Sequence, residues 1–287
     1  MIPTGRFAPS PTGELHFGSL VAAVASFLNI KTRGGRWLVR VENIDPPREV
    51  AGSADSLLHS LQLFGLRSDE PVLFQSRRMP AHRAAMQQLL NEGQAYWCGC
   101  SRSELPADGV YPGTCRKGLP PGKSPRAVRI KTSPEPVRFT DQIRGPVSET
   151  LRDTVGDFVI WRADDLPAYQ LAVVVDDAFQ EISEVVRGYD LLGSTARQVH
   201  VQRCLNLPTP DYAHHPVAAT TDGCKLSKRL ASDPIRNAPP EESLARALRF
   251  LGQDCPAGLT LAGTWQWALE NWDLGKIPRK KKIILQD

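Results

Sequence analysis

Two segments far apart in the chain carry residue types that suit phosphate chemistry. The first, APSPTGELHFGSL at residues 8–20, places His16 two residues before Gly18. An imidazole N–H can donate to a phosphate oxygen, and a glycine lets a base or ribose approach the backbone. The second, KLSKR at residues 225–229, offers two lysines and a serine that could stabilise a polyphosphate as a bond breaks. Each is a weak signal alone, but together they predict a site for the phosphates of a nucleotide.

The elements around the first segment predict a nucleotide-binding α/β unit. Residues 5–8 form a candidate strand, a helical pattern runs from Gly18 to the glycine pair at 34–35, and residues 37–41 alternate as strands do. A strand, helix and strand of this length require parallel pairing with a right-handed crossover. The first turn of such a helix directs backbone N–H groups and its dipole toward an anion. His16 stands where that anion would bind.

The rest of the chain predicts an α/β fold, with a Rossmann-type core, an inserted zinc-containing subdomain and a short helical C-terminal region. LAVVVDD at residues 171–177 predicts a strand returning to the parallel sheet, followed by EVVRG at 184–188. Helical patterns span residues 51–66, 79–92, 241–252 and 261–271. We expect the first half of the core at 1–94, the insertion at 95–170, the second half with the KLSKR loop at 171–235, and the helical region at 236–287.

Three of the six cysteines stand close together, and they are the candidate metal ligands. Cys98, Cys100 and Cys115 lie in a chain whose N-terminus lacks a secretory signal, so clustering favours a metal over disulfides. Three thiolates suit tetrahedral Zn²⁺, and a closed structural site needs one more ligand, for which nearby Tyr111 is the candidate. Reduced thiols without a metal are the alternative.

Positive charge is concentrated in two segments of a chain whose net charge is +4. Residues 116–144 hold eight Lys or Arg against two acids, and GKIPRKKKIILQD at the C-terminus holds five basic residues within seven positions. Such patches favour a polyanionic partner, with a solvated face as the alternative. The longest early apolar run has nine residues, short of the roughly 20 that span a bilayer. We therefore expect a cytoplasmic protein that has no membrane partner.

The same motifs resemble a known family. PSPTGELHFGS resembles the HIGH signature of class I aminoacyl-tRNA synthetases, and KLSKR resembles their KMSKS loop. RFAPSPTGELHFGS, VENIDPPR, AVVVDD and EVVRGYDLL are similar to the glutamyl branch in particular, and the resemblance runs from Arg6 to about Pro234. It implies a class I synthetase core that activates glutamate with ATP and Mg²⁺. Asn43 stands where an aspartate is more typical of the family, which removes one carboxylate beside the pocket.

The resemblance also implies roles for individual residues. His16 and Lys228 would act in catalysis, with Arg187 and Tyr169 near the side-chain carboxylate of glutamate and Glu42 receiving its ammonium group. The implied ATP-binding residues are His16, Gly18, Ser19, Lys225, Ser227 and Lys228. The implied glutamate-binding residues are Arg6, Phe7, Ala8, Pro9, Ser10, Glu42, Tyr169 and Arg187. An internal ion pair between Arg6 and Glu42, and a core position for Tyr169, are the alternatives.

The length of chain after the KLSKR loop distinguishes branches of the family. From 287 − 229, only 58 residues follow Arg229, too few for the helical anticodon-binding region of glutamyl-tRNA synthetases. The chain therefore resembles the glutamyl-queuosine tRNA(Asp) synthetases, which activate glutamate without tRNA and esterify it to queuosine in the anticodon loop of tRNA(Asp). We expect such an enzyme, acting as a monomer. The alternatives are a synthetase charging the 3′ end of tRNA(Glu), a HIGH-family nucleotidyltransferase that uses no RNA, and an inactive RNA-binding paralogue.

Overall fold

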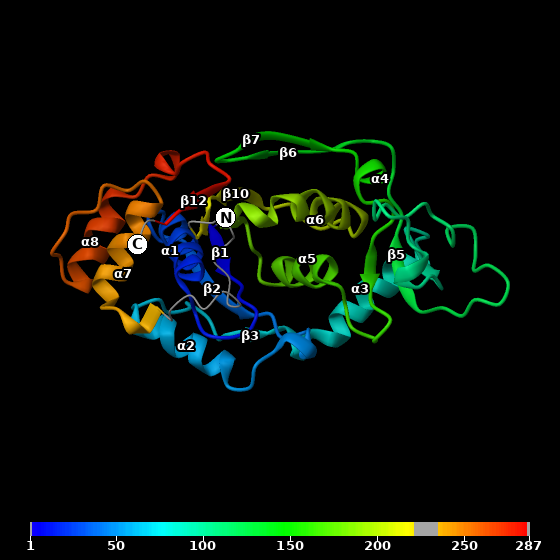
Figure 1. The fold of residues 1–287 in the computed structure, drawn as a ribbon, viewed down its shortest axis with the longest axis horizontal. Coiled ribbons are helices and arrows are strands. Elements are labelled where there is room, and N and C mark those ends of the chain that lie inside the picture. The colour runs from blue at the N-terminus through cyan, green and yellow to red at the C-terminus, as the bar shows by residue number, and fades with distance from the viewer. Residues whose placement is uncertain (1, 221–234, 286–287) are drawn as a thin grey trace.

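A twisted, mostly parallel sheet forms the centre of the molecule (Figure 1). A computed structural model describes residues 2–220 and 235–285 of the chain. In this described part, seven strands are ordered β3-β2-β1-β9-β10-β6-β7. Their bounds are β1 Thr4–Phe7, β2 Arg36–Val41, β3 Leu73–Phe74, β6 Val137–Asp141, β7 Gly145–Glu149, β9 Glu184–Gly188 and β10 Asp211–His215. Strands β3, β2, β1, β9 and β10 pair in parallel, and β6 with β7 forms an antiparallel hairpin beside β10.

The two faces of the sheet are covered by different helices, because alternate residues of a strand point to opposite faces. In β2, Trp37 and Val39 belong to the core shared with α1, α2, α7 and α8, whereas Leu38 belongs to the core shared with α3, α5 and α6. The helices are α1 Phe17–Lys31, α2 Ser53–Leu63, α3 Met79–Asn91, α4 Leu151–Thr154, α5 Tyr169–Phe179, α6 Leu192–Cys204, α7 Pro240–Phe250 and α8 Leu261–Asn271. Helix α1 joins β1 to β2, which confirms the predicted strand–helix–strand unit.

One predicted element is wrong. Residues 171–177, predicted as a strand, lie in helix α5. A short apolar run fits a buried strand or a buried helix equally well, and only a polar face distinguishes their periods. Because most of α5 is covered, from Leu171 to Asp177, the run LAVVV shows no such face. The helices predicted at 51–66, 79–92, 241–252 and 261–271 and the strand at 184–188 are all present.

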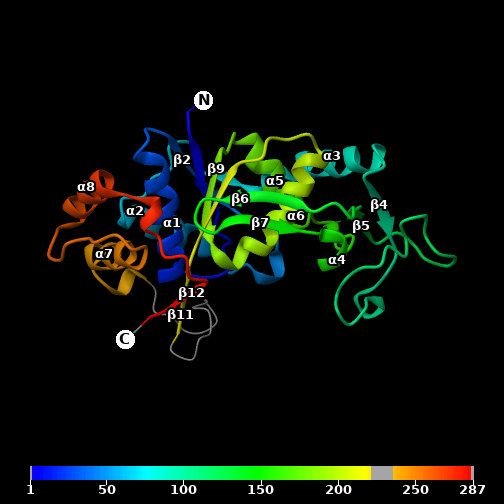
Figure 2. The same cartoon turned by 90° about the horizontal axis from the view of Figure 1, so that it is seen from above.

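Residues 95–170 do not form one separate unit. Strands β4 Ala95–Cys98, β5 Ala127–Ile130 and β8 Val159–Trp161 form an antiparallel sheet at the end of the molecule farthest from α8 (Figure 2). The β6–β7 hairpin falls in the same range but extends the central sheet. Near the C-terminus, β12 Lys282–Ile284 pairs in parallel with β11 Val217–Ala219, so the predicted helical region also contributes a strand. Among the described helices, none is both long and apolar enough to cross a bilayer.

Candidate active site

A cavity of about 780 Å³ opens at the carboxyl ends of β1, β9 and β10. The carboxyl edge of a parallel sheet is where α/β proteins bind ligands, next to the point at which the strand order reverses. Here that point lies between β1 and β9. The predicted residues that line the cavity are Arg6, Phe7, Ala8, Pro9, Ser10, His16, Gly18, Ser19, Tyr169 and Arg187. Lys225, Ser227 and Lys228 lie outside the described residues.

The loop after β1 places His16 at the N-terminus of α1. His16 is the N-cap residue, and its backbone carbonyl accepts the N–H of Ser19 at 2.9 Å. The Ser19 hydroxyl lies 3.2 Å from His16 Nε2. A side chain at position 18 would crowd the imidazole, since a Cβ there would lie 3.2 Å from His16 Cε1. The ring and the first N–H groups of α1 therefore share one side of the cavity, an arrangement that suits an anion.

Arg187, at the end of β9, is held by neutral groups. Its Nε–H donates to His214 Nε2 at 3.0 Å, and its Nη2 donates to the Thr195 hydroxyl at 2.7 Å. The side chain is buried, and within the described structure Nη1 has no hydrogen-bond partner. A buried guanidinium with an unused N–H is costly unless a ligand supplies an acceptor. Because Arg187 also lines the cavity, that acceptor would come from a bound molecule.

His214 acts as a neutral acceptor for Arg187. Its Nδ1 lies 2.5 Å from Asp141 Oδ2, and both side chains are fully buried. Burial lowers the pKa of His214 to about 4, although the hydrogen bond to Asp141 opposes the shift. Since Arg187 Nε can only donate, His214 Nε2 must be the unprotonated nitrogen, and Nδ1–H donates to Asp141. The chain Asp141–His214–Arg187 thus fixes the direction of the guanidinium.

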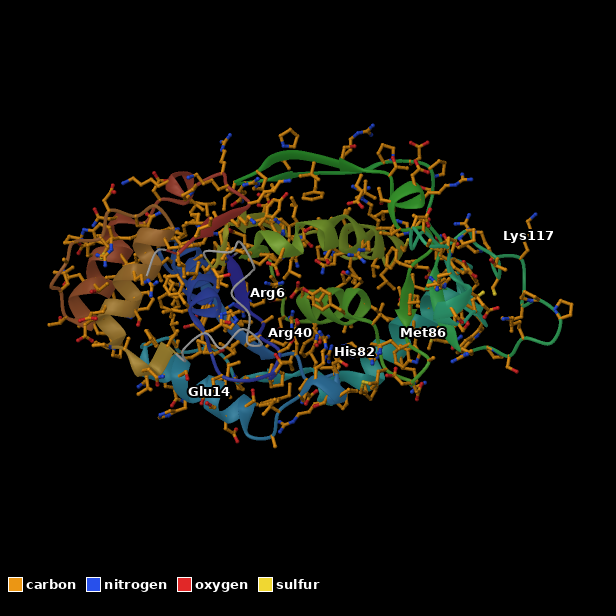
Figure 3. The ribbon with its side chains drawn as sticks, viewed as in Figure 1. Arg6, Glu14, Arg40, His82, Met86 and Lys117 are labelled. Atoms are coloured by element: carbon orange, nitrogen blue, oxygen red, sulfur yellow. The ribbon has the colours of Figure 1, made fainter. Side chains whose placement is uncertain are left out.

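A second buried network holds Arg6, which also lines the cavity. Arg6 Nε lies 3.1 Å from Asp177 Oδ1, and the same oxygen accepts Arg40 Nη2 at 2.7 Å. Arg40 also reaches Glu42 Oε1 at 3.3 Å. Figure 3 shows Arg6 and Arg40 on neighbouring strands of the sheet, β1 and β2. The alternative of an ion pair between Arg6 and Glu42 is therefore not what the structure shows. Arg6 and Arg40 each pair with Asp177 instead.

Glu42 follows β2 and is buried beside Arg40 rather than among the residues that line the cavity. Burial raises the pKa of the Glu42 carboxyl, against the opposing charges of Arg40 and Arg6. The Glu42 charge in turn acts on Tyr169, which lines the cavity. Glu42 thus lies close to the cavity wall and holds its proton more readily than an exposed glutamate would.

Five buried polar residues of these networks were not predicted as site residues: Arg40, Asp141, Asp177, Thr195 and His214. Asp177 was assigned to a strand, and helix α5 instead carries it toward Arg6 and Arg40. His214 and Asp141 stand on β10 and β6 and meet only because these strands pair. No local motif marks either residue, so tertiary pairing alone reveals them.

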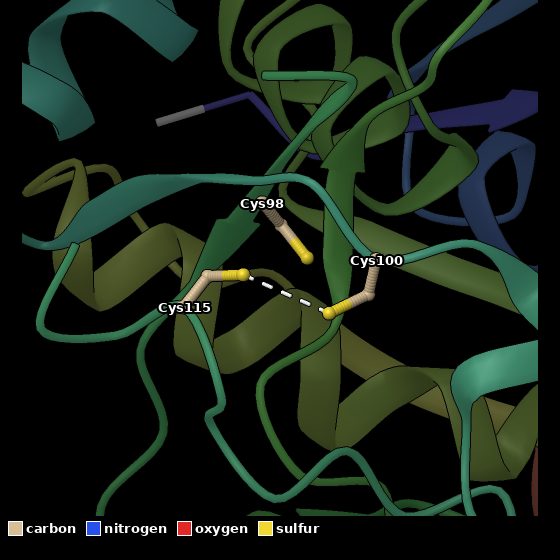
Figure 4. A group of neighbouring side chains, drawn as sticks. All are labelled: Cys98, Cys100 and Cys115. Atoms are coloured by element: carbon tan, nitrogen blue, oxygen red, sulfur yellow. Dashed lines mark hydrogen bonds between the residues drawn. The ribbon is translucent and has the colours of Figure 1, made fainter. Parts of the chain in front are cut away.

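The three clustered cysteines come together as predicted. The Sγ atoms of Cys98, Cys100 and Cys115 all lie within 4.8 Å of one another (Figure 4). The Tyr111 hydroxyl lies 3.3 Å from Cys98 Sγ and accepts the backbone N–H of Cys115 at 3.0 Å. These four side chains could hold a metal ion together.

Neighbouring groups favour the thiolate form of Cys98, one of the three clustered cysteines. Arg129 Nε–H donates to Cys98 Sγ at 3.3 Å. Burial raises the pKa of the Cys98 thiol, but hydrogen bonds from Tyr111, the Cys100 backbone and Arg129 outweigh it and hold that pKa below its ordinary value. Gly156 has φ 64°, and a Cβ there would lie 2.2 Å from the Tyr111 carbonyl oxygen, so only glycine lets the backbone approach Tyr111 this closely. A preformed set of thiol ligands suits a thiophilic ion.

The chain is similar to known proteins along nearly all of its length. Residues 4–108 and 116–239 match the family described as class I tRNA synthetases (E and Q), catalytic domain. The chain is 50% identical over 293 residues to the glutamyl-Q tRNA(Asp) synthetase of Dechloromonas aromatica, covering 98% of this chain and 97% of that protein. It is also 50% identical to the protein of the same name from Geobacter sulfurreducens, with 96% and 93% covered.

Solved structures agree with this similarity. The glutamate-tRNA synthetase of Elizabethkingia anophelis superposes with a TM-score of 0.85 at 25% identity, covering 100% of this chain and 68% of that one. A glutamate tRNA ligase from Elizabethkingia meningosepticum, in complex with its amino acid, gives a TM-score of 0.83 at 25% identity, with 98% and 66% covered. The chain thus has the α/β fold of a class I synthetase and spans about two thirds of these structures.

Proposed function

Since the chain belongs to the glutamyl-Q tRNA(Asp) synthetase family of class I tRNA synthetases, we propose that it activates glutamate with ATP and transfers it to queuosine in tRNA(Asp). The observation that carries this proposal is the cavity at the carboxyl edge of the sheet. The HIGH-like loop with His16 lines this cavity together with the buried Arg6 and Arg187. A phosphate-binding loop and two carboxylate-binding arginines share one site.

The first step joins glutamate to AMP. A glutamate α-carboxylate oxygen attacks the α-phosphorus of ATP, the bond to the bridging oxygen breaks, and pyrophosphate leaves with the electron pair. His16, Gly18, Ser19 and the N-terminus of α1 would bind the phosphates, and Lys225, Ser227 and Lys228 would stabilise the leaving pyrophosphate. Mg²⁺ would enter with ATP and neutralise part of its charge. Positioning and charge stabilisation supply the rate, because no protein group forms a covalent bond.

The two networks set the position of glutamate. Arg187 would offer its unused Nη1–H to the side-chain carboxylate, next to Tyr169, and Glu42 would receive the ammonium group. Arg6 and residues 7–10 would form the remaining wall. In the second step a hydroxyl of the queuosine cyclopentenediol attacks the adenylate carbonyl, an ester forms, and AMP leaves.

Glu42 gives this assignment a pH test. A carboxyl with a raised pKa is protonated at mildly acid pH and then cannot bind an ammonium group, so the affinity for glutamate should weaken as pH falls through that pKa. We expect Glu42→Gln to raise KM for glutamate roughly tenfold to a hundredfold, the value of one charge-assisted hydrogen bond. The variant should also lose this pH dependence, measured by glutamate-dependent pyrophosphate exchange. An unchanged KM would remove Glu42 from the ammonium site, and Glu70→Gln, at an exposed position, is the control.

We further propose that Cys98, Cys100, Cys115 and Tyr111 hold a structural Zn²⁺. The ion would pin the loops that connect β4 to β5, and no catalytic step passes through it. Elemental analysis of the purified protein should show one zinc per chain, and Cys115→Ala should lose it and lower the melting temperature. Cys204→Ala, at a cysteine outside the cluster, should keep the metal. The proposal would be contradicted if the purified wild-type protein contained no metal and Cys115→Ala had the same melting temperature as the wild type.

The function itself is tested with ATP, labelled glutamate and two preparations of tRNA(Asp), one carrying queuosine and one lacking it. We expect glutamate-dependent pyrophosphate exchange without tRNA, and label transfer only to the queuosine-containing preparation. Charging of tRNA(Glu) in place of tRNA(Asp) would favour a conventional glutamyl-tRNA synthetase. Exchange with no transfer to either tRNA would favour a nucleotidyltransferase that makes a small molecule.

A further inference from the structure

The basic segment near the C-terminus is bonded to the wall of the active-site cavity. Strand β12 pairs with β11 in the register Val217–Lys282, Ala218–Ile283 and Ala219–Ile284. The Val217 N–H donates to the Lys281 carbonyl at 3.1 Å. Val217 and Ala218 also line the cavity. Figure 2 shows β11 and β12 side by side at one edge of the molecule. The register therefore brings the residues that precede β12, Arg279–Lys281, to the rim of the cavity.

An aromatic contact fixes the same segment at a second point. Lys281 Nζ lies 5.8 Å from the centroid of the Tyr189 ring, and the Arg144 guanidinium lies 4.7 Å from that centroid. Tyr189 is flanked in the chain by Gly188 and Asp190, both of which line the cavity. Two cations from distant parts of the chain thus meet beside the opening, where each adds to the positive potential.

Three basic side chains of this segment have no acidic partner among the described residues. Arg279, Lys280 and Lys281 are exposed and form no ion pair with any described residue. Nearby Lys276, by contrast, reaches Asp254 Oδ2 at 3.7 Å. Two half-buried lysines are also paired, Lys31 with Asp69 and Lys123 with Glu104. A rim of unpaired cations beside a cavity suits an extended polyanion that lies across the opening.

We propose that Arg279, Lys280 and Lys281 bind the phosphate backbone of the acceptor RNA as its base enters the cavity. This inference rests on the proposed function, which makes a base within an RNA loop the acceptor. Such a base cannot enter without carrying its neighbouring phosphates to the rim, because each nucleotide is joined to the next through a phosphate. Lysine and arginine neutralise these phosphates without reading sequence. The segment supplies affinity for the RNA backbone, and the cavity supplies selection of the base.

The test compares two full-length variants. R279Q/K280Q/K281Q removes three charges, and R279K/K280R/K281R keeps all three as the matched control. The affinity for queuosine-containing tRNA(Asp) is measured against salt concentration, and glutamate-dependent pyrophosphate exchange is measured without tRNA. Because each phosphate contact contributes about 0.7 to the slope of log K against log salt, we expect the glutamine variant to lose about 2 from this slope. Its Kd for tRNA should rise at least tenfold at low salt.

Each outcome is decisive. Exchange activity should be unchanged in both variants, which also shows that they fold, and the control should bind tRNA as the wild type does. Wild-type tRNA affinity and salt slope in the glutamine variant would overturn the inference. A raised KM for ATP with unchanged tRNA binding would overturn it in favour of a site for ATP phosphates. If the wild-type protein itself failed to glutamylate queuosine-containing tRNA, the proposed function would fail first, a result distinct from the failure of this segment alone.

Discussion

The Arg187→Gln variant is expected to lose at least a hundredfold in kcat/KM for glutamate, measured by pyrophosphate exchange. Arg187 is buried, lines the cavity and has an Nη1 that no described residue uses. Removing it would leave the substrate carboxylate without its cationic partner in a desolvated site. Breaking one side of a buried charge pair costs about 3–5 kcal/mol, and 1.4 kcal/mol corresponds to a tenfold change. A hundredfold loss is therefore a lower bound.

The loss in kcat/KM should be seen for glutamate and not for ATP. KM for ATP is expected to change little, because Arg187 belongs to β9, whereas the loop proposed to bind the phosphates follows β1. Arg203→Gln, at an exposed position on α6, changes the same side chain outside the cavity and should retain wild-type activity. Wild-type kinetics for glutamate in Arg187→Gln would show that the side-chain carboxylate binds elsewhere.

The Asp177→Asn variant is expected to lower the free energy of unfolding by about 3–5 kcal/mol. One Asp177 oxygen accepts both Arg6 and Arg40, and all three side chains are buried. Without this carboxylate the two buried guanidinium groups lose the anion that they share. Urea unfolding measures the loss, and Asp254→Asn is the matched control. Asp254 is exposed and pairs with Lys276 at 3.7 Å, so its removal should cost no more than about 1 kcal/mol.

The difference in the free energy of unfolding between the wild type and Asp177→Asn should depend on pH in a definite direction. Burial raises the pKa of the Asp177 carboxyl, but Arg6 and Arg40 outweigh it and hold that pKa below its ordinary value. A group whose pKa is depressed by folding stabilises the folded state above its unfolded pKa, about 4 for aspartate. The contribution is lost as pH falls through the folded pKa. The gap between the wild type and Asp177→Asn should therefore be largest near neutral pH and shrink in acid, and a gap independent of pH would contradict the network.

The residues of the site that could be predicted from the sequence are those that local chain geometry places. His16 and Gly18 belong to one loop between a strand and a helix, and both elements are evident from periodicity and glycine positions. Cys98, Cys100 and Cys115 could be grouped by spacing alone. In each case a few consecutive elements determine the arrangement, so sequence separation and side-chain type suffice.

The buried residues that position Arg6 and Arg187 could not be predicted. Asp177 was missed because the apolar run of α5 has no exposed face that would reveal its helical period. His214 and Asp141 depend on the pairing of β10 with β6, strands that are separated in the chain by three strands and three α-helices. Long-range pairing leaves no local signal in the chain. These positions set the direction of Arg6 and Arg187, so they decide the geometry of a pocket whose lining residues were evident.

The most direct test of the account locates the glutamate on the RNA. Queuosine-containing tRNA(Asp) is incubated with the protein, ATP and labelled glutamate, and then cleaved with a ribonuclease under mildly acidic conditions that preserve the ester. We predict that the label is recovered in the oligonucleotide that contains the anticodon loop, and that it is absent when the tRNA lacks queuosine. Label recovered at the 3′-terminal adenosine would contradict the central claim and identify a synthetase that charges the acceptor end.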